Sequence, residues 1–424
     1  MATGRHASVS LTYNGKTASQ MNEYLSAFKY TDVASGAGDS ISIDLSDKDR
    51  RWIDSWFPQK GDKLKPTIVR YNWDKDGTIS KMSCGTFVVD DFSFRGGPIQ
   101  CTIEAAAIPS TSGFKVTERT NTYEKTTLKN IGLTIAKRNG LSLYYEPKTI
   151  SIESVTQDKK SDCSFFNELC VKYGLALKIY NDRLVVFDEA AYEAKPVVAT
   201  LTEADFEPNW QWNTSLAGTY TGVRYQYTHA EKNKTFTVNV GGGNRILICD
   251  DEANNQTEAT LIALAKANNA NKSTTTMRIT LRTPAWNIVA TNCVQIKGLG
   301  KLDGKYYVET ATHSVGSGTK TTLSLRKVEK RLTKQEPPAP TAAVKVSSTT
   351  AEKKKTTIVY KVGDRVRVKK GAKTYPGGSL ASFVYNTVYD VIQVGGKGLP
   401  DDRIVIGQGK AVTAAIKAAD LYKA

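Results

Sequence analysis

Short runs of alternating apolar and polar residues cover positions 5 to 110. A period of two places every second side chain on one face of a strand, so these runs predict antiparallel strands. Asn14-Gly15 and Asp76-Gly77 are dipeptides typical of tight hairpin turns. The segment therefore predicts a small β-barrel or sandwich. The clearest runs are Val9, Leu11 and Tyr13; Ile41, Ile43 and Leu45; and Ile68, Val69 and Tyr71.

One short helix is expected to interrupt these strands. Asp47 can cap it, Trp52, Ile53 and Trp56 follow at helical spacing, and Pro58 stops it.

Near residue 111 the period changes from 2 to about 3.6. Residues 126–139 and 161–173 each place apolar side chains on one helical face, and Gly140 and Gly174 follow as stop signals. Strand-like stretches come after both helices. Residues 111–195 therefore predict an α+β insert domain.

Strand patterns return after residue 196 and continue to residue 333, with one helical stretch at 256–267. We expect a second barrel in this segment. Residues 334–357 are rich in Pro, Ala, Ser, Thr and Lys and predict a linker. Residues 358–424 show five or six short strands, which suits a small barrel. The expected fold class is mainly β, with an α+β insert between two barrels (1–110 and 196–333) and a third small barrel at the end.

Composition fits a folded globular chain, with 424 residues, 40% apolar and 24% charged. No run approaches the roughly 18 apolar residues of a membrane span, and the first residues lack the apolar stretch of a signal peptide. The six cysteines show neither a C-x-x-C pair nor metal-ligand spacing. We therefore expect reduced, buried cysteines in a protein made in the cytoplasm, with no membrane partner.

The net charge of +16 is uneven along the chain. Residues 1–195 carry 26 Lys and Arg against 24 Asp and Glu, whereas residues 196–424 carry 32 against 18. This excess favours an anionic partner. No nucleic-acid-binding motif accompanies it, so nucleic acid is not the expected partner.

Candidate catalytic and ligand-binding patterns favour structural interpretations. The histidines lie far apart in sequence, the glycine clusters lack the strand-to-helix context of nucleotide loops, and the acidic cluster precedes a helix whose dipole it can offset. The lysine run lies in the linker, and the two tryptophans fit a core or a subunit interface better than a ligand platform. We expect no catalytic residue, cofactor or metal. The residues concerned are His6, His229 and His313; Gly241 to Gly243, Gly298 and Gly300; Asp250, Asp251 and Glu252; Lys353 to Lys355; and Trp210 and Trp212.

Three segments resemble the central hub proteins of contractile phage tails and phage-like bacteriocins, the late control protein D family, which is related to type VI secretion spike proteins. Residues 162–187 (DCSFFNELCVKYGLALKIYNDRLVVF) resemble its aromatic helix, "YG", strand and hairpin. Residues 304–328 (GKYYVETATHSVGSGTKTTLSLRKV) resemble the strands that close its second barrel, and residues 45–63 (LSDKDRRWIDSWFPQKGDK) its turn before a "GD" strand. The resemblance spans roughly residues 5 to 333.

This resemblance implies a non-enzymatic, structural baseplate hub. Family members form a homotrimeric ring that joins a sixfold tail tube protein to a threefold spike protein among other baseplate proteins. The implied location is a virion or phage-like particle, either a phage or a bacteriocin.

The last segment resembles a bacterial SH3-like domain of the kind found in cell-wall lytic enzymes. A groove with peptidoglycan or a neighbouring tail protein as ligand is one interpretation, and aromatic rings that only fill a core are the other. An alternative for the whole chain is a tail-associated protein that binds or degrades cell wall. The candidate groove residues are Arg365, Arg367, Lys369, Lys370, Tyr375, Phe383, Tyr385 and Tyr389.

Overall fold

The computed structural model describes residues 4–108, 112–316, 318–333, 360–396, 399–409 and 411–424. The chain divides into two compact units, Met1–Thr341 and Ala342–Ala424. The predicted linker at 334–357 lies entirely outside the described residues, and the lysine run at 353–355 lies within it. No described helix is long and apolar enough to cross a membrane.

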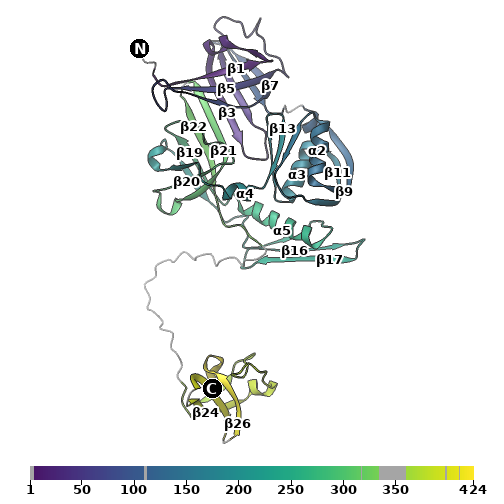
Figure 1. Cartoon of the computed structure of the whole chain (residues 1–424), viewed down its shortest axis with the longest axis vertical. Helices are drawn as coiled ribbons and strands as arrows, with labels where there is room; N and C mark the ends of the chain where they lie inside the picture. Colours follow the sequence, from purple (N-terminus) through teal and green to yellow (C-terminus); the bar gives the residue numbers. More distant parts are fainter. Residues whose placement is uncertain (1–3, 109–111, 317, 334–359, 397–398, 410) are drawn as a thin grey trace. The chain divides into compact units, whose positions relative to one another are not determined.

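One 14-stranded sheet dominates the larger unit and draws its strands from two distant parts of the sequence (Figure 1). The first group is β1 (His6–Tyr13), β2 (Lys16–Thr17), β3 (Leu25–Val33), β4 (Ser40–Ser46), β5 (Lys63–Tyr71), β6 (Ile79–Ser83), β7 (Phe87–Arg95) and β8 (Gln100–Ala106). The second group is β14 (Ala199–Leu201), β15 (Gln211–Thr214), β19 (Thr275–Leu281), β20 (Cys293–Ile296), β21 (Gly304–Gly316) and β22 (Lys320–Lys327).

The alternating sequence pattern is what builds these strands. In β4, Ile41, Ile43 and Leu45 are buried while the residues between them are partly exposed, which confirms the predicted inward face. At the first hairpin, Asn14 and Gly15 both have positive φ, as a type I′ turn requires.

The two groups meet where β3 pairs antiparallel with β21, from Ala27 opposite Gly316 to Val33 opposite Thr310. Each group nevertheless buries its own apolar core, one around Phe28 and Phe87 and the other around Ile279 and Leu323. The mainly β prediction is confirmed. The pairing of the described strands follows an open path and closes neither predicted barrel.

The short helix predicted after Asp47 is wrong, because residues 52–56 form turns. Asp47 does act as a local acceptor. Its buried carboxylate receives the backbone N–H groups of Trp52 (2.9 Å) and Ile53 (3.1 Å). These bonds anchor a compact turn instead of the first turn of a helix.

Residues 112–194 form an α+β region that packs beside the large sheet (Figure 1). The two predicted helices are present, and the predicted stop residues Gly140 and Gly174 follow them with positive φ. The side chains of Thr127 and Ser161 cap the first turns of these helices. The elements are α1 (Gly113–Val116), β9 (Glu118–Thr127), α2 (Leu128–Arg138), β10 (Ser142–Tyr145), β11 (Ser151–Ser161), α3 (Asp162–Lys172), β12 (Ala176–Tyr180), β13 (Arg183–Phe187) and α4 (Glu189–Ala194).

The strands expected after residue 196 divide between two sheets. β16 (Gly222–His229), β17 (Lys234–Gly241) and β18 (Ile246–Cys249) form a separate three-stranded sheet that packs against α5 (Gln256–Asn271). Their buried side chains share one apolar core with α2 and α3. This core therefore combines residues from 107–186 with residues from 223–267.

The smaller unit contains a five-stranded antiparallel sheet in the order β26-β25-β24-β23-β27. Its core includes Val366, Tyr389, Ile404 and Ile416. The strands are β23 (Arg365–Val368), β24 (Val388–Gly396), β25 (Leu399–Gln408), β26 (Ala411–Lys417) and β27 (Leu421–Lys423).

A buried lysine joins the α+β region to the large sheet. Lys178 on β12 donates through Nζ to Asp32, to Asp39 Oδ1 (3.1 Å) and to the carbonyl of Val33 (2.7 Å). Asp32 also accepts the N–H of Ala290 (2.8 Å). Burial raises the pKa of Asp39 to about 6, although Lys178 acts in the opposite direction. Three segments far apart in sequence thus share one ionic cluster, the Lys178 clamp.

A second buried cluster surrounds Arg326 on β22, whose side chain is 2% exposed. Its guanidinium contacts Glu193 (2.5 Å) on α4 and Glu309 (3.1 Å) on β21, and it lies 4.3 Å from the ring centre of Tyr307. Arg331 contacts Glu193 as well (2.7 Å). The cluster ties α4 to the second strand group.

His313 is fully buried on β21 opposite Tyr30 of β3, with ring centres 6.2 Å apart. Its Nδ1 lies 3.2 Å from Thr321 Oγ1. Burial lowers the pKa of His313 to about 4. The ring is therefore neutral inside the fold at neutral pH.

Replacing the lysine of the clamp should destabilise the larger unit strongly. Lys178→Met leaves the Asp32 and Asp39 carboxylates buried without a cation, which typically costs about 3–5 kcal/mol. Lys60→Met is the matched control, since the Lys60–Asp91 pair is exposed, and should change the free energy of unfolding by at most about 0.5 kcal/mol. Urea unfolding followed by tryptophan fluorescence reports on this unit alone, because all six tryptophans lie between positions 52 and 286. Equal effects of the two substitutions would contradict the role of the clamp.

Acid should destabilise the larger unit through His313. Its folded-state pKa lies below the ordinary value of about 6.5, so the unfolded chain takes up a proton first as the pH falls from about 6.5 to 4. This one group then removes up to about 3 kcal/mol of stability over that window. His313→Gln should shrink the difference between the unfolding free energies at pH 7 and pH 4.5, measured by the same fluorescence assay. An undiminished difference would count against this assignment.

Candidate functional site

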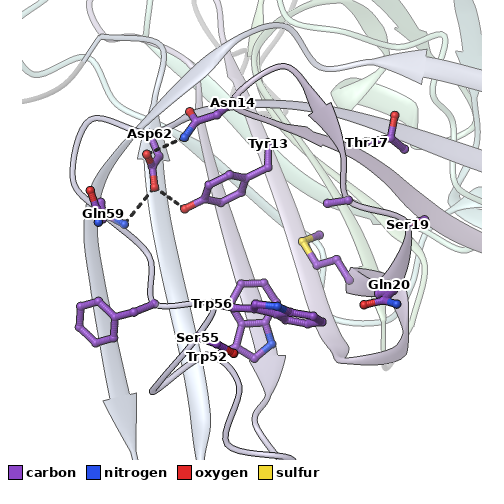
Figure 2. Close-up of a pocket in the computed structure, with 13 residues that line it drawn as sticks. Tyr13, Asn14, Thr17, Ser19, Gln20, Trp52, Ser55, Trp56, Gln59 and Asp62 are labelled. Atoms are coloured by element: carbon purple, nitrogen blue, oxygen red, sulfur yellow. Dashed lines mark hydrogen bonds between the residues drawn. The ribbon is translucent and has the colours of Figure 1, made fainter.

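A pocket of about 630 Å³ opens at one end of the first strand group. Three segments form it: the turn between β1 and β2, the short 3-10 helix η1 (Ser19–Glu23), and the turns at 52–62 (Figure 2). Antiparallel pairing of β1 with β5 brings Tyr13 opposite Leu64 and so places the first and third segments side by side. The lining residues are Tyr13, Asn14, Thr17, Ala18, Ser19, Gln20, Met21, Trp52, Ser55, Trp56, Phe57, Gln59 and Asp62.

Aromatic side chains make one wall of this pocket (Figure 2). Trp52 is 5% exposed and packs into the core of the first strand group. Trp56 meets it edge to face, with ring centres 5.4 Å apart, and meets Tyr24 in the same way at 5.5 Å. The Arg51 guanidinium lies 4.9 Å from the Trp56 ring centre. These contacts hold Trp56 in place.

Asp62 organises the opposite rim. Its carboxylate accepts hydrogen bonds from Tyr13 Oη, Asn14 Nδ2 (2.8 Å) and the backbone N–H of Gln59 (3.0 Å). Burial acts to raise the pKa of Asp62, but these three hydrogen bonds outweigh it and lower the pKa below its usual value. Burial and the bond to Asp62 raise the pKa of Tyr13. At neutral pH the rim therefore carries one negative charge and a protonated tyrosine.

The described residues give this pocket no nucleophile paired with a base. Among them, no group of three or more His, Cys, Asp or Glu side chains is placed to hold a metal ion. All six cysteines are free thiols, and burial raises the pKa of Cys84 and Cys101 to about 12. The arrangement is suited to binding through ring faces and hydrogen bonds.

The basic members of the predicted groove in the smaller unit are exposed. Arg365 and Arg367 alternate along β23, and Lys369 Nζ donates to the carbonyl of Ala419 (2.6 Å). Lys370 is also exposed.

The aromatic members differ in their surroundings. Tyr389 is 3% exposed and lies in the core, where Tyr385 packs against the same cluster and donates to the carbonyl of Ala372 (2.9 Å). Phe383 is 62% exposed, and Tyr375 donates to Asp402 Oδ1 (2.8 Å). Packing therefore accounts for Tyr389 and much of Tyr385. The groove stays a prediction, with Phe383 and Tyr375 as its accessible rings.

The two tryptophans singled out by their spacing are partly buried against the core of the second strand group. Trp212 Nε1 donates to Tyr306 Oη (3.0 Å), and Trp210 Nε1 donates to Glu203 (3.3 Å). Both rings are part of the packing of this unit.

The remaining candidates from the sequence are histidines, acidic residues and glycines, and their contacts or backbone angles fit structural roles. His6 stacks on Tyr71 with ring centres 4.4 Å apart, and His229 is buried on β16. Asp251 pairs with Lys266 of α5 (2.7 Å). The glycines at 241, 243, 298 and 300 all have positive φ, as turn positions require.

The pocket itself was not predicted from the sequence. The sequence pattern predicts a helix for Trp52 and Trp56 and a strand for Tyr13, and neither signal indicates that these residues line one pocket. The Asn14-Gly15 turn and the Gly61-Asp62 turn do carry a signal, because paired strands place their end turns side by side.

The sequence matches no protein-family model and no curated protein. Solved structures do resemble the fold. A tail protein from Neisseria meningitidis MC58 superposes with a TM-score of 0.58 at 12% identity, over 76% of this chain and 97% of that one. The 43 kDa tail protein of prophage MuSo2 from Shewanella oneidensis gives 0.56 at 13% identity, over 75% of this chain and 98% of that one. About three quarters of the chain therefore has the fold of phage tail proteins.

Proposed function

We propose that the chain is the structural baseplate hub of a contractile tail or phage-like particle. Three copies form a ring that joins the sixfold tail tube above to the threefold central spike below. The observation that carries this proposal is the fold match, which extends over 97% of one tail protein and 98% of another. The chain then resides in the tail baseplate of the particle.

The architecture of the larger unit supports a ring. One sheet carries two separate apolar cores, and buried ionic clusters tie the α+β region to it. Each copy thus offers two rigid lobes, and three copies offer six. A structure with six similar lobes on a threefold axis can contact a sixfold partner and a threefold partner on opposite sides.

Unpaired strand edges offer a route to ring closure. Among the described strands, β6 pairs only with β5, and β15 pairs only with β19. Ile79 at the start of β6 is 59% exposed. An exposed edge with an apolar side chain is a template for pairing with another chain, and burial in a ring interface would protect it.

The smaller unit is proposed as a contact module for a neighbouring tail protein or for peptidoglycan. Residues 357–424 carry 11 Lys and Arg against 5 Asp and Glu, which favours an anionic surface. Arg365, Arg367, Lys370 and Phe383 are its exposed candidate contacts. Such contacts weaken as salt rises, since exposed charges are screened over about 8 Å at physiological ionic strength.

The alternative is a tail-associated protein that binds or degrades cell wall. Degradation needs an acid and base pair or an activated nucleophile. A zymogram on purified cell walls distinguishes a structural hub from a cell-wall-degrading enzyme, and clearing by this chain alone would establish the enzyme.

The ring predicts a trimer in solution that depends on the β6 edge. Light scattering after size-exclusion chromatography should give three times the mass of one chain. Ile79→Glu places a charge on the exposed edge and should weaken the trimer at least tenfold, because a buried unpaired charge is costly in an interface. Val412→Glu is the matched control, since Val412 is 65% exposed on β26 of the smaller unit. A monomer that persists in the presence of tube and spike proteins would contradict the hub function, and a trimer unaffected by Ile79→Glu would exclude this edge.

A further inference from the structure

The pocket in Figure 2 has the size and composition of a small-molecule site. Its volume of about 630 Å³ lies in the range of roughly 300–1,000 Å³ that is typical of such sites. Its lining contains both aromatic rings and polar side chains.

Aromatic rings on both sides of the pocket offer ring faces to a ligand. Tyr13 and Trp56 are partly exposed, and Phe57 is 49% exposed where it stacks on Phe94 (5.6 Å). Flat apolar faces of this kind pack against the C–H face of a sugar ring. Trp52 also lines the pocket, and its buried Nε1 has no hydrogen-bond partner among the described residues, so the wall contains an unsatisfied donor.

Uncharged polar side chains surround these rings. No side-chain hydrogen bond within the described part of the chain engages them, so their amides and hydroxyls are free to bond a ligand. Hydroxyls and amides around an aromatic face match a polyhydroxylated molecule, which needs many hydrogen bonds at its edge. These residues are Thr17, Ser19, Gln20, Ser55 and Gln59.

The charge at the pocket rim limits which ligands the pocket can bind. Asp62 is ionised at the rim and repels anionic molecules. A cation is disfavoured too, because the Asp62 carboxylate already accepts three hydrogen bonds. The pocket therefore favours an uncharged ligand over an anion or a cation.

We propose that this pocket binds a neutral saccharide of one or two rings, which stacks on Trp56 and bonds to the amides of Gln20 and Gln59. The site is independent of the trimeric ring and adds a ligand-binding function to it. Neutral sugars occur both in amino-sugar polymers and in hexose polymers, which share the ring face and hydroxyl edge recognised here.

Titration calorimetry and saturation-transfer NMR on the full chain test this site. The probes are N,N′-diacetylchitobiose for amino-sugar polymers, cellobiose and maltose for hexose polymers, and tetramethylammonium for a cation. At least one disaccharide should bind with a dissociation constant of about 1 mM or tighter, which corresponds to about 4 kcal/mol. The probe that binds identifies the source of the sugar.

Matched substitutions locate the binding. Trp56→Ala should weaken it at least tenfold, and Gln20→Ala and Gln59→Ala several-fold each. Tyr144→Ala and Gln226→Ala remove an exposed ring and an exposed amide elsewhere and should leave it unchanged. Because Trp56→Ala can disturb the turn, the exposed glutamine variants, checked by thermal unfolding, keep the test independent of folding.

Three outcomes would overturn the proposal. The first is no saccharide binding at 20 mM probe, and the second is binding of tetramethylammonium alone. The third is saccharide binding that persists in the Trp56 and glutamine variants, which would place it elsewhere on the chain. None of these outcomes bears on the trimer, so the two proposals fail separately.

Discussion

Backbone pairing between β3 and β21 is the contact on which the larger unit depends. It converts two strand groups, each with its own apolar core, into one sheet. Side chains reinforce it at the same place: His313 of β21 packs against Tyr30 of β3, and Tyr30 donates to Asp39 (3.0 Å). Asp39 in turn belongs to the Lys178 clamp. The backbone hydrogen bonds between β3 and β21, the buried His313 and the Lys178 clamp thus all stabilise the place where the two strand groups join.

Buried charge at this junction favours specificity more than stability. An ion pair gains little from burial, because both partners lose their water, but an unmatched buried charge is costly. Only an arrangement that brings β12, β3 and the Ala290 loop together satisfies Lys178, Asp32 and Asp39. Alternative packings of the α+β region on the sheet leave one of them unpaired. The clamp therefore selects one orientation, which suits a protein whose proposed task is geometric.

Local patterns in the sequence predicted much of this fold. Alternation located β1, β4 and β5, and apolar residues at helical spacing followed by Gly140 and Gly174 located α2 and α3, because each signal acts over a few neighbouring residues. The pairing of strands across the chain was not predictable in this way. It decides that β16 and β17 join the core of α2 and α3, and that the two strand groups share one sheet whose described strands close no barrel. The pocket was not predictable for the same reason, since the pairing of β1 with β5 is what brings the segments of Tyr13 and Trp56 to one pocket.

The β3–β21 junction also has a consequence for how the chain is made. Val33 pairs with Thr310, about 280 residues later, so one edge of β3 has no partner until almost the whole larger unit has left the ribosome. At about 5–20 residues per second, that interval lasts roughly 15–60 s. During it the first strand group exposes an edge that can pair with other nascent chains. Completion of the sheet is therefore a late step in the synthesis of the chain, and a polysome that carries many copies has a particular need for chaperones that cover strand edges.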